Sequence, residues 1–397
     1  MTAWPETVLS EALADVAPGF ACGEDVEDGV FQFRMNNITT EGQLDLSRRR
    51  RVPRDYRNIE RFLVQPGDVL FNATNSPDLV GKTAFFPGLE ERAVFSNHFL
   101  RLRPRDGEMD GRYLTRWLNL QFLHGRFKGM CRQWVNQATV GRDALLSLRI
   151  PLPPLPEQRR IAEILDKADA LRAKRREAIR KLDTLTQSIF LDMFGDPISN
   201  PRGWPTVRFE QLCERVTVGI VVQPASYYVS EGVPALRSLN IRPGKIVLDD
   251  LVYFSKSDND TKLAKTKLRA GDVVLVRSGQ PGTAAVVPPE LDDVNAIDIL
   301  IATPDQQLTN PTFLCEFFNS AGGRDLVLSR QRGQVQKHLN VGSLNQAILP
   351  LPSIDLQCEF AARVAAVERH REAELASSTA LDALFASLQH RAFRSEL

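Results

Sequence analysis

Basic and amide-bearing side chains gather in a few short segments, and their chemistry suits contact with a nucleic acid. Arginine and lysine neutralise phosphates, while arginine on guanine and glutamine or asparagine on adenine form paired hydrogen bonds in the major groove. A segment that mixes these types can both hold a duplex and distinguish its bases. In the first half of the chain, the candidate DNA-binding residues are Arg48, Arg49, Arg50, Arg51, Arg132, Gln133, Asn136, Gln137 and Arg142. In the second half, they are Arg277, Ser278, Gln280, Arg330, Arg332, Gln334, Gln336 and Lys337.

The alternative for each charged run is a solvated loop with no ligand, which is the commoner case for such runs. For the run 48–51 alone, the two interpretations carry nearly equal weight. The segment 330–338 favours DNA, because donors, acceptors and a glycine share one short stretch. Its counterpart near 132–142 occupies the equivalent place before a proline-rich segment.

The motifs that would indicate catalysis by this chain are missing. The five histidines form no HExxH pair, and the five cysteines stand far apart without a zinc-ligand spacing. Gly81-Lys82-Thr83 lacks the glycine that a phosphate-binding loop needs five residues earlier, and Asn310-Pro311-Thr312-Phe313 lacks the second proline of an adenine methyltransferase motif. We therefore predict no catalytic, metal or cofactor-binding residue, although an active site assembled from distant residues stays open as an alternative.

These candidate segments sit in a chain that repeats itself once, at a period of about 200 residues. Trp4-Pro5 recurs as Trp204-Pro205, and Gly67-Asp68-Val69 recurs as Gly271-Asp272-Val273. Further matched pairs, in the same order, are Val140-Gly141 with Val341-Gly342, Ile150-Pro-Leu-Pro153 with Leu349-Pro-Leu-Pro352, Gln158 with Gln357, Leu182-Asp183 with Leu381-Asp382, and Phe194 with Phe393. Two units of domain size exclude a solenoid of short repeats. Duplication for stability alone is the alternative, but it does not explain why both halves end in the same motif and helix.

A long helix is predicted at the end of each half. Residues 157–194 contain no proline or glycine, and their apolar residues follow steps of three and four, as in a coiled-coil seam. The predicted seam comprises Ile161, Ile164, Ala168, Leu171, Leu182, Leu185 and Ile189 in the first helix and Phe360, Val364, Val367, Leu381 and Leu388 in the second. Helices of this length span roughly 55 Å. We expect them to pair with each other, antiparallel; two surface helices on separate domains are the alternative.

Between these markers, each half resembles a set of short strands followed by one helix. The first half offers strands at 69–73, 83–86 and 98–102 and a helix at 111–123, and the second offers strands at 273–277 and 297–302 and a helix at 311–318. The predicted fold class is α+β. It comprises two globular domains in a pseudo-twofold arrangement, joined by two long antiparallel coiled-coil helices.

Composition sets the remaining limits. The 397 residues are 43% hydrophobic and 25% charged, with a formal net charge of +1, so any nucleic-acid contact must come from local patches. The start of the chain lacks the charged and apolar regions of a secretion signal, and no apolar run is long enough for a membrane helix. We predict a cytoplasmic protein without a membrane partner.

The stretch from Pro151 (PLPPLPEQRRIAEILD), continuing to Leu191-Asp-Met-Phe-Gly-Asp-Pro197, closely resembles the central conserved region of the specificity subunits of type I restriction-modification systems. The segments 67–82 and 334–352 also resemble parts of the target-recognition domains in that family. The resemblance covers nearly the whole chain. The second proline-rich copy, 349–357, departs from the first because it lacks the Pro-Glu-Gln-Arg run.

This resemblance implies a division of labour. Residues 1–150 and 205–348 would be the two target-recognition domains, and residues 151–204 and 349–397 would be conserved regions that carry the long helices. Double-stranded DNA and two adenine methyltransferase subunits would be the partners, with a restriction endonuclease or translocase subunit as a further one. S-adenosylmethionine would be bound by the methyltransferase and no cofactor by this chain. The alternatives are a coiled-coil scaffold for protein interactions and an orphan DNA-binding protein without a methyltransferase.

Overall fold

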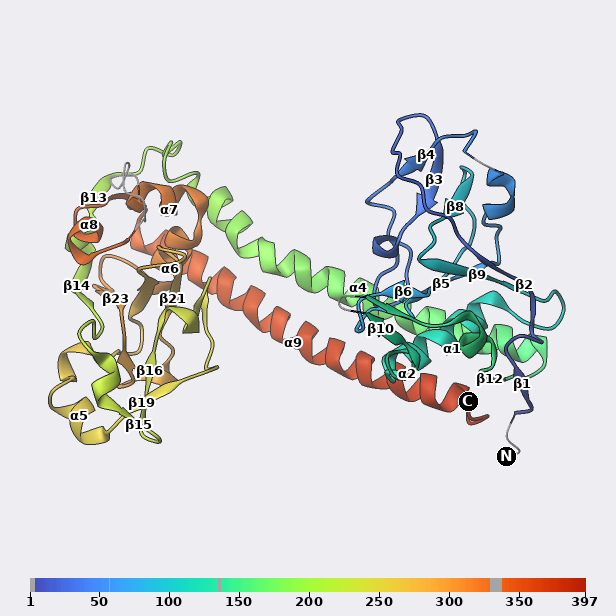
Figure 1. Ribbon diagram of the computed structural model, residues 1–397. Helices are drawn as coiled ribbons and strands as arrows, with labels where there is room; N and C mark the ends of the chain where they lie inside the picture. The colour runs from blue at the N-terminus through green and yellow to red at the C-terminus, as the bar shows by residue number, and fades with distance from the viewer. Residues whose placement is uncertain (1–3, 57, 135–136, 329–337) are drawn as a thin grey trace. The chain divides into compact units, whose positions relative to one another are not determined.

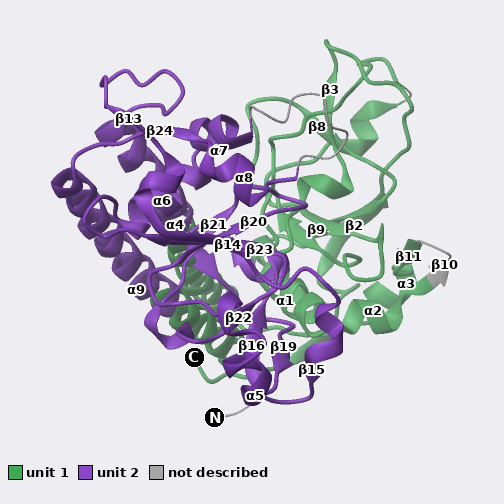
Figure 2. Cartoon of the chain, turned by 90° about the vertical axis from the view of Figure 1, so that its left-hand side faces the viewer, with its two compact units in different colours: residues 1–176, 377–397 green, residues 177–376 purple. Residues whose placement is uncertain are grey.

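The chain folds into two compact units that each contain parts of both long helices. A computed structural model describes residues 4–56, 58–134, 137–328 and 338–397 (Figure 1). Unit 1 comprises residues 1–176 and 377–397, and unit 2 comprises residues 177–376 (Figure 2). Helix α4 (Leu155–Phe194) begins in unit 1 and ends in unit 2, whereas helix α9 (Ile354–Ala392) begins in unit 2 and ends in unit 1. Each unit is therefore completed by the end of a helix that starts in the other.

Unit 1 is built around an antiparallel sheet with the strand order β2-β9-β5-β7. Three smaller sheets have the orders β4-β3-β8, β10-β11-β6 and β1-β12. The strands are β1 (Glu6–Val8), β2 (Leu13–Pro18), β3 (Val30–Phe33), β4 (Arg51–Val52), β5 (Val69–Asn72), β6 (Thr74–Asn75), β7 (Thr83–Phe85), β8 (Ala93–Phe95), β9 (Phe99–Pro104), β10 (Arg132–Trp134), β11 (Gln137–Thr139) and β12 (Arg149–Pro151). The shorter helices are α1 (Gly111–Leu123), α2 (Arg126–Met130) and α3 (Arg142–Leu146).

Unit 2 has a corresponding sheet with the order β14-β23-β20-β21. Its smaller sheets have the orders β15-β19-β16-β22, β17-β18 and β13-β24. The strands are β13 (Thr206–Arg208), β14 (Cys213–Val218), β15 (Tyr228–Val229), β16 (Val233–Leu236), β17 (Ile241–Arg242), β18 (Lys245–Ile246), β19 (Val252–Phe254), β20 (Val273–Val276), β21 (Ala284–Val286), β22 (Asn295–Ala296), β23 (Ile299–Pro304) and β24 (Ile348–Pro350). The shorter helices are α5 (Lys256–Asp260), α6 (Pro311–Asn319), α7 (Ala321–Leu328) and α8 (Val341–Asn345).

The main sheets show that the sequence repeat is a repeat of structure. Strands β2, β9, β5 and β7 correspond in order and direction to β14, β23, β20 and β21, and the parallel pair β3 and β8 corresponds to β16 and β22. The strands expected at 69–73, 83–86, 273–277 and 297–302 are present with small changes at their ends. The α+β class and the two long helices are confirmed.

The repeated Gly-Asp pair supplies a buried carboxylate to each main sheet. Asp68 accepts hydrogen bonds from the backbone N–H of Gln65 at 2.7 Å and from Nε of Arg103 at 2.7 Å. Asp272 accepts from the backbone N–H of Arg269 at 2.9 Å and from Arg215 at 2.9 Å. Both aspartates are almost completely buried. The motif therefore recurs because each half needs a buried acceptor at the start of its central strand.

The repeated glutamine after the proline-rich segment ties each long helix to a shorter one. The side chain of Gln158 accepts from the backbone N–H of Asp110 at 2.9 Å and donates to the carbonyls of Glu108 at 2.8 Å and Pro153 at 2.9 Å. Gln357 likewise accepts from the backbone N–H of Asn310 at 2.9 Å and donates to the carbonyl of Pro352 at 2.9 Å. Both glutamines are fully buried. They fix the starts of α4 and α9 against the N-terminal ends of α1 and α6.

Replacing Gln158 with leucine is expected to lower the free energy of unfolding of unit 1 by about 2 kcal/mol, because buried backbone groups lose their partners. Hydrogen exchange of the α1 amides would measure the change. Gln121→Leu is the control, since the Gln121 side chain contacts Arg126 in an exposed hydrogen bond. Equal protection of α1 in the wild type and the Gln158→Leu variant would contradict the assigned role.

Within each unit, the two long-helix segments run antiparallel and pair through charges. In unit 1, Nε of Arg172 lies 2.6 Å from Oδ1 of Asp382, and Arg160 donates to the carbonyl of Leu397 at 3.2 Å. In unit 2, Nε of Arg371 lies 2.9 Å from Oδ1 of Asp183. The repeat thus places the same arginine–aspartate pair in both units.

The predicted apolar seam differs from the buried stripe of the helices at two positions. Leu171 is 55% exposed and Leu185 is 38% exposed, so the prediction is wrong for both. The stripe on α4 in unit 1 instead continues through Leu165 and Asp169 to Arg172, whose guanidinium carbon lies 4.3 Å from the centre of the Phe385 ring. Charged pairs occupy the helix–helix contact there, and the leucine one step away turns to solvent. The other seam residues are buried or half-buried: Ile161, Ile164, Ala168, Leu182, Ile189, Phe360, Val364, Val367, Leu381 and Leu388.

Candidate nucleic-acid interface

The arginine run of unit 1 is held against its own domain at three of its four positions. Arg49 and Arg51 each lie 2.6 Å from a carboxylate oxygen of Glu91, and Arg50 donates to the carbonyl of Glu24 at 2.9 Å. Arg48 is exposed, and within the described residues its guanidinium has no hydrogen-bonding or ion-pair partner. Arg48 is therefore the residue of this run that can contact a phosphate without losing an internal partner.

The second basic segment of unit 1 forms a hairpin whose strand β11 pairs with β6. Strands β10 and β11 pair antiparallel, with Arg132 opposite Thr139, and β11 also pairs with β6. Arg132 and Gln137 are exposed on this hairpin, as is Arg142 at the start of α3. Gln133 belongs to β10, whereas Asn136 lies outside the described residues. Figure 1 shows β10 and β4 at different places in unit 1.

In unit 2, Arg277 is engaged by the protein itself. Its guanidinium forms an ion pair with Asp298, lies 2.7 Å from Nε2 of His338, and donates to the carbonyl of Leu339 at 3.3 Å. The Ser278 hydroxyl lies 2.7 Å from Nδ1 of the same histidine. Gln280 is exposed in the turn that follows. Arg330, Arg332, Gln334, Gln336 and Lys337 lie outside the described residues.

Sequence reasoning missed Asp298 as a member of this cluster, and it included His338 only as the last residue of the segment 330–338. The repeat could not have shown the contact, because pairing Val140 with Val341 sets Thr139 opposite Asn340. The backbone hydrogen bonds of Val140 and Leu339 instead make Ser278 and His338 equivalent to Thr74 and Thr139 of unit 1. Those two threonine hydroxyls lie 3.1 Å apart. A residue pair that occupies the same place in both halves marks a conserved connection within the fold.

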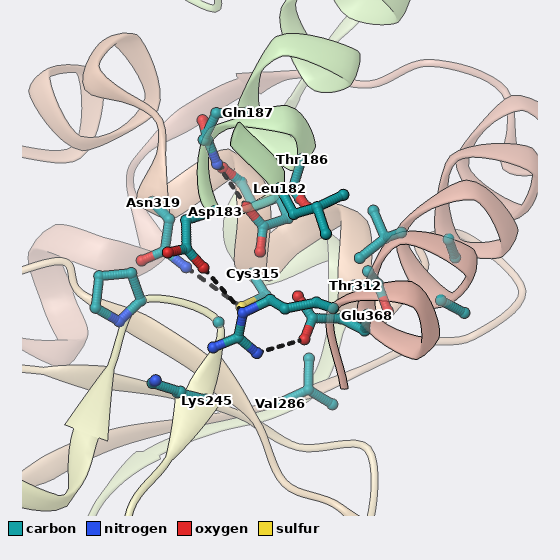
Figure 3. A pocket seen from close by; sticks show the side chains of 17 residues that line it. Leu182, Asp183, Thr186, Gln187, Lys245, Val286, Thr312, Cys315, Asn319 and Glu368 are labelled. Atoms are coloured by element: carbon teal, nitrogen blue, oxygen red, sulfur yellow. Dashed lines mark hydrogen bonds and ion pairs between the residues drawn. The ribbon is translucent and has the colours of Figure 1, made fainter. Parts of the chain in front are cut away.

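A cavity of about 570 Å³ lies in unit 2 between α4, α6 and α9 (Figure 3). Asp183, Gln187 and Glu368 line it from the long helices, and Glu316 lines it from α6. Gln187 donates a 2.5 Å hydrogen bond to the Glu316 carboxylate, while Arg371 contacts Asp183 and Glu368. Burial raises the pKa of Glu316, and Glu368 raises it further, against the lowering effect of Gln187. A buried carboxylate that forms no ion pair with the described residues is thus part of the wall.

Unit 1 has an arginine at the position equivalent to Glu316. Arg116 lies 2.8 Å from Oδ1 of Asp166 and 3.1 Å from Oδ2 of Asp169. Its charge is therefore compensated within the unit, whereas Glu316 has no ion-pair partner among the described residues.

Replacing Glu316 with glutamine is expected to raise the thermal stability of unit 2 by a few degrees at neutral pH. A carboxyl whose pKa is raised by folding costs stability when it is ionised, and this cost disappears as the pH falls below the ordinary carboxyl pKa. The difference between variant and wild type should therefore shrink between neutral pH and about pH 4. Thermal unfolding across this range checks it, and a variant that is less stable at every pH would contradict the assignment.

The remaining features of the described residues do not add a catalytic centre. Lys82, from the Gly-Lys-Thr sequence, is buried and donates to the carbonyl of Met35 at 3.1 Å. Its ammonium group therefore already has a hydrogen-bond partner within the protein. In the part of the chain that the structure describes, no group of three His, Cys, Asp or Glu residues could hold a metal ion. The described helices include none that is long and apolar enough to cross a membrane.

Comparison with known proteins finds similar chains in one family. Residues 35–181 match the family model of the type I restriction modification DNA specificity domain. The chain is 23% identical to the type I restriction enzyme EcoBI specificity subunit of Escherichia coli, over 98% of this chain and 85% of the relative. Over nearly its whole length, the chain is thus similar to a specificity subunit of a type I restriction-modification system. A putative MjaX specificity subunit of Methanocaldococcus jannaschii is 27% identical over 54% of this chain, and the match spans 55% of that relative.

Solved structures agree with this specificity-subunit fold. A chain from a structural study of complex assembly and conformational transition of the type I restriction-modification system has a TM-score of 0.63 and 18% identity, with 100% of this chain and 98% of that chain covered. The S subunit from M. genitalium has a TM-score of 0.58 and 13% identity, with 98% and 96% covered. Specificity subunits are the noncatalytic members of their complexes, and they bind DNA and assemble with the other subunits.

Proposed function

We propose that this specificity subunit reads a split DNA site, with one half recognised by residues 1–150 and the other by residues 205–348. The proposal rests on a backbone hydrogen bond that occurs at the same place in both units. It joins the residue after the basic segment to the residue that follows the central strand, β5 in unit 1 and β20 in unit 2. The backbone N–H of Val140 donates to the carbonyl of Ala73 at 2.9 Å, and that of Leu339 donates to the carbonyl of Arg277 at 3.0 Å. In each unit, this tie ends a segment rich in arginine and glutamine. Two copies of the same DNA-contacting segment match the two halves of a split DNA site.

Within this proposal, exposed side chains divide into two roles. Arg48, Arg132 and Arg142 contact phosphates, whereas Gln137 and Gln280 have the donor and acceptor needed to distinguish bases. The residues at 330–337 contribute to the second half-site through the same mixture of chemistry. Arg277 does not contact DNA directly in this proposal, because its guanidinium already contacts Asp298, Leu339 and His338.

The conserved regions, residues 151–204 and 349–397, are proposed to dock two adenine methyltransferase subunits, and the assembled complex also accepts a restriction endonuclease or translocase subunit. S-adenosylmethionine would bind to the methyltransferase. Gln158 and Gln357 are buried, so the docking surface consists of exposed positions around them. The five cysteines, all within the described residues, are free thiols, which supports a place in the reducing cytoplasm.

Mapping N6-methyladenine in the DNA of cells that carry the cognate methyltransferase, with and without this chain, tests the proposal. We expect a bipartite methylated motif only when the chain is present. Exchange of residues 205–348 for those of a relative should change one half of the motif and leave the other half unchanged. Methylation that is independent of the chain would instead favour a scaffold or an orphan DNA-binding protein.

Single substitutions in the purified complex test the residue roles. Arg48→Ala and Arg132→Ala should weaken binding to all sequences and reduce the salt dependence by about one phosphate contact each. Gln137→Ala should relax the preference at one position of the first half-site. Lys181→Ala is the control, because Lys181 is an exposed residue in α4, more than 20 residues from Gln158, that pairs with Glu177. An equal loss in the control would assign the effect to overall charge.

A further inference from the structure

The cavity of unit 2 is lined at the two positions where unit 1 holds an aromatic ring and a guanidinium. In unit 1, Phe385 of α9 lies beside Arg116 of α1, with the guanidinium carbon 5.9 Å from the ring centre. At the equivalent positions of the repeat, unit 2 has Thr186 in place of the phenylalanine and Glu316 in place of the arginine. Both residues line the cavity (Figure 3). Unit 2 therefore lacks the ring and the cation together.

The acidic partner of Arg116 has a counterpart in unit 2, although the arginine does not. Arg116 lies 3.1 Å from Oδ2 of Asp169, and the repeat sets Glu368 in the place of Asp169. Each of these two carboxylates also lies 3.0 Å from an arginine one turn further along its helix, Arg172 in unit 1 and Arg371 in unit 2. Unit 2 thus keeps the anion and the arginine beside it but loses the cation from the shorter helix.

Glu316 adds a buried acceptor to this place. The residue is only 8% exposed, so its carboxylate is largely removed from water. Gln187 donates to Oε2 of Glu316, while Oε1 accepts no hydrogen bond from the residues that the structure describes. A buried charged oxygen costs free energy unless a donor meets it. The wall of the cavity therefore offers a position at which a cation would be stabilised.

The size and charge of the cavity limit what it can hold. Its volume of about 570 Å³ is in the range of small-molecule sites, whereas the pocket that Arg116 and Phe385 line in unit 1 has about 290 Å³. Three anions and two cations line the cavity, namely Asp183, Glu316, Glu368, Arg371 and Lys245. Lys245 is exposed on β18 and thus remains in contact with water. The formal charge of −1 fits a ligand with a single positive charge.

We propose that this cavity of unit 2 binds a small ligand with one planar ring and one amidinium, guanidinium or ammonium group. The cationic group takes the place of the missing arginine and donates charge-assisted hydrogen bonds to Glu316 and Glu368. The ring stacks on the Arg371 guanidinium, as Phe385 does on the equivalent arginine of unit 1 at 4.3 Å. Such a ligand would join α4, α6 and α9 within unit 2. Its binding does not depend on whether the unit reads a half-site.

Benzamidine is a suitable probe, because it joins a phenyl ring to an amidinium. Isothermal titration calorimetry with the full chain should show one site with a Kd below about 1 mM. Benzamide has nearly the same shape without the charge, and it should bind at least about tenfold more weakly. Benzamidine should also slow hydrogen exchange in α6 of unit 2 and leave α1 of unit 1 unchanged.

Two substitutions test the two parts of the site separately. Glu316→Gln should weaken benzamidine binding about tenfold or more, because it removes the charge that faces the amidinium. Thr186→Phe should block binding by filling the place of the ring. Glu359→Gln is the matched control on unit 2, since Glu359 is an exposed residue that pairs with Arg363 outside the cavity lining. Thermal unfolding of each variant shows that the unit is still folded.

Several results would overturn the proposed ligand site. One is the absence of saturable binding up to about 10 mM benzamidine, where a site with a Kd of about 1 mM would be nearly full. Another is binding that Glu316→Gln and Thr186→Phe both leave unchanged. Equal affinity for benzamide would exclude the role of the cation, and an equal loss in Glu359→Gln would assign the binding to surface charge.

Discussion

Deletion of residues 377–397 is expected to unfold unit 1 while unit 2 keeps its fold. These residues supply Phe385, Ala392 and Phe393 to the hydrophobic core of unit 1, and the Phe393 ring lies 5.2 Å from that of Tyr113. Loss of one buried phenylalanine costs about 3–5 kcal/mol, so loss of two such rings removes most of the stability of an ordinary domain. Hydrogen exchange followed by mass spectrometry would show rapid exchange in β5 and β9 and retained protection in β20 and β23.

Point variants make the same test without shortening the chain. Phe393→Ala should destabilise unit 1 by about 3–5 kcal/mol. Leu384→Ala is the matched control on the same helix, because Leu384 is 52% exposed and should contribute little. Protection of β5 and β9 in the shortened chain at the level of the full chain would refute the assigned role of this segment.

Replacing Asp272 with alanine is expected to destabilise unit 2 by about 3–5 kcal/mol, the usual cost of removing one member of a buried ion pair. The carboxylate is completely buried, and the variant would leave Arg215, Thr303 and the backbone N–H of Arg269 without their acceptor. Denaturant unfolding, monitored by hydrogen exchange in β20, measures the effect.

An exposed ion pair gives the comparison for this variant. Glu359 pairs with Arg363 one turn further along α9, and both side chains are about half exposed. Glu359→Ala should change the stability of unit 2 by less than about 1 kcal/mol. Similar losses for Glu359→Ala and Asp272→Ala would show that Asp272 stabilises the unit no more than a surface charge does.

The features that repeat along the chain could be predicted, because a repeat needs no knowledge of tertiary contacts. Proline-rich segments and uninterrupted apolar spacing were enough to locate α4 and α9. The exposure of Leu171 could not be predicted in this way. Apolar spacing does not reveal that Arg172 and Asp382 would occupy the helix contact, since an ion pair between residues 210 apart leaves no local pattern.

The candidate site shows the same limit. Residue type predicted Arg277 and Ser278 as DNA-binding residues, but it could not distinguish an arginine that faces solvent from one that already has partners within the protein. Three of the four residues from Arg48 to Arg51 are likewise engaged by Glu91 and Glu24, which lie outside the run in sequence. Charge runs indicate that cations are present, whereas only tertiary structure shows which of them already have partners.

The exchange of helix ends between the units has a consequence for synthesis. Ribosomes make the chain from its N-terminus, and domains usually fold in that order. Unit 1, however, needs Phe385 and Phe393 for its core, and these residues are translated after the whole of unit 2. Unit 2, which spans residues 177–376, can complete its fold earlier. Unit 1 starts before unit 2 and is therefore completed after it, and a ribosome that stalls between residues 376 and 385 leaves unit 1 with an incomplete core.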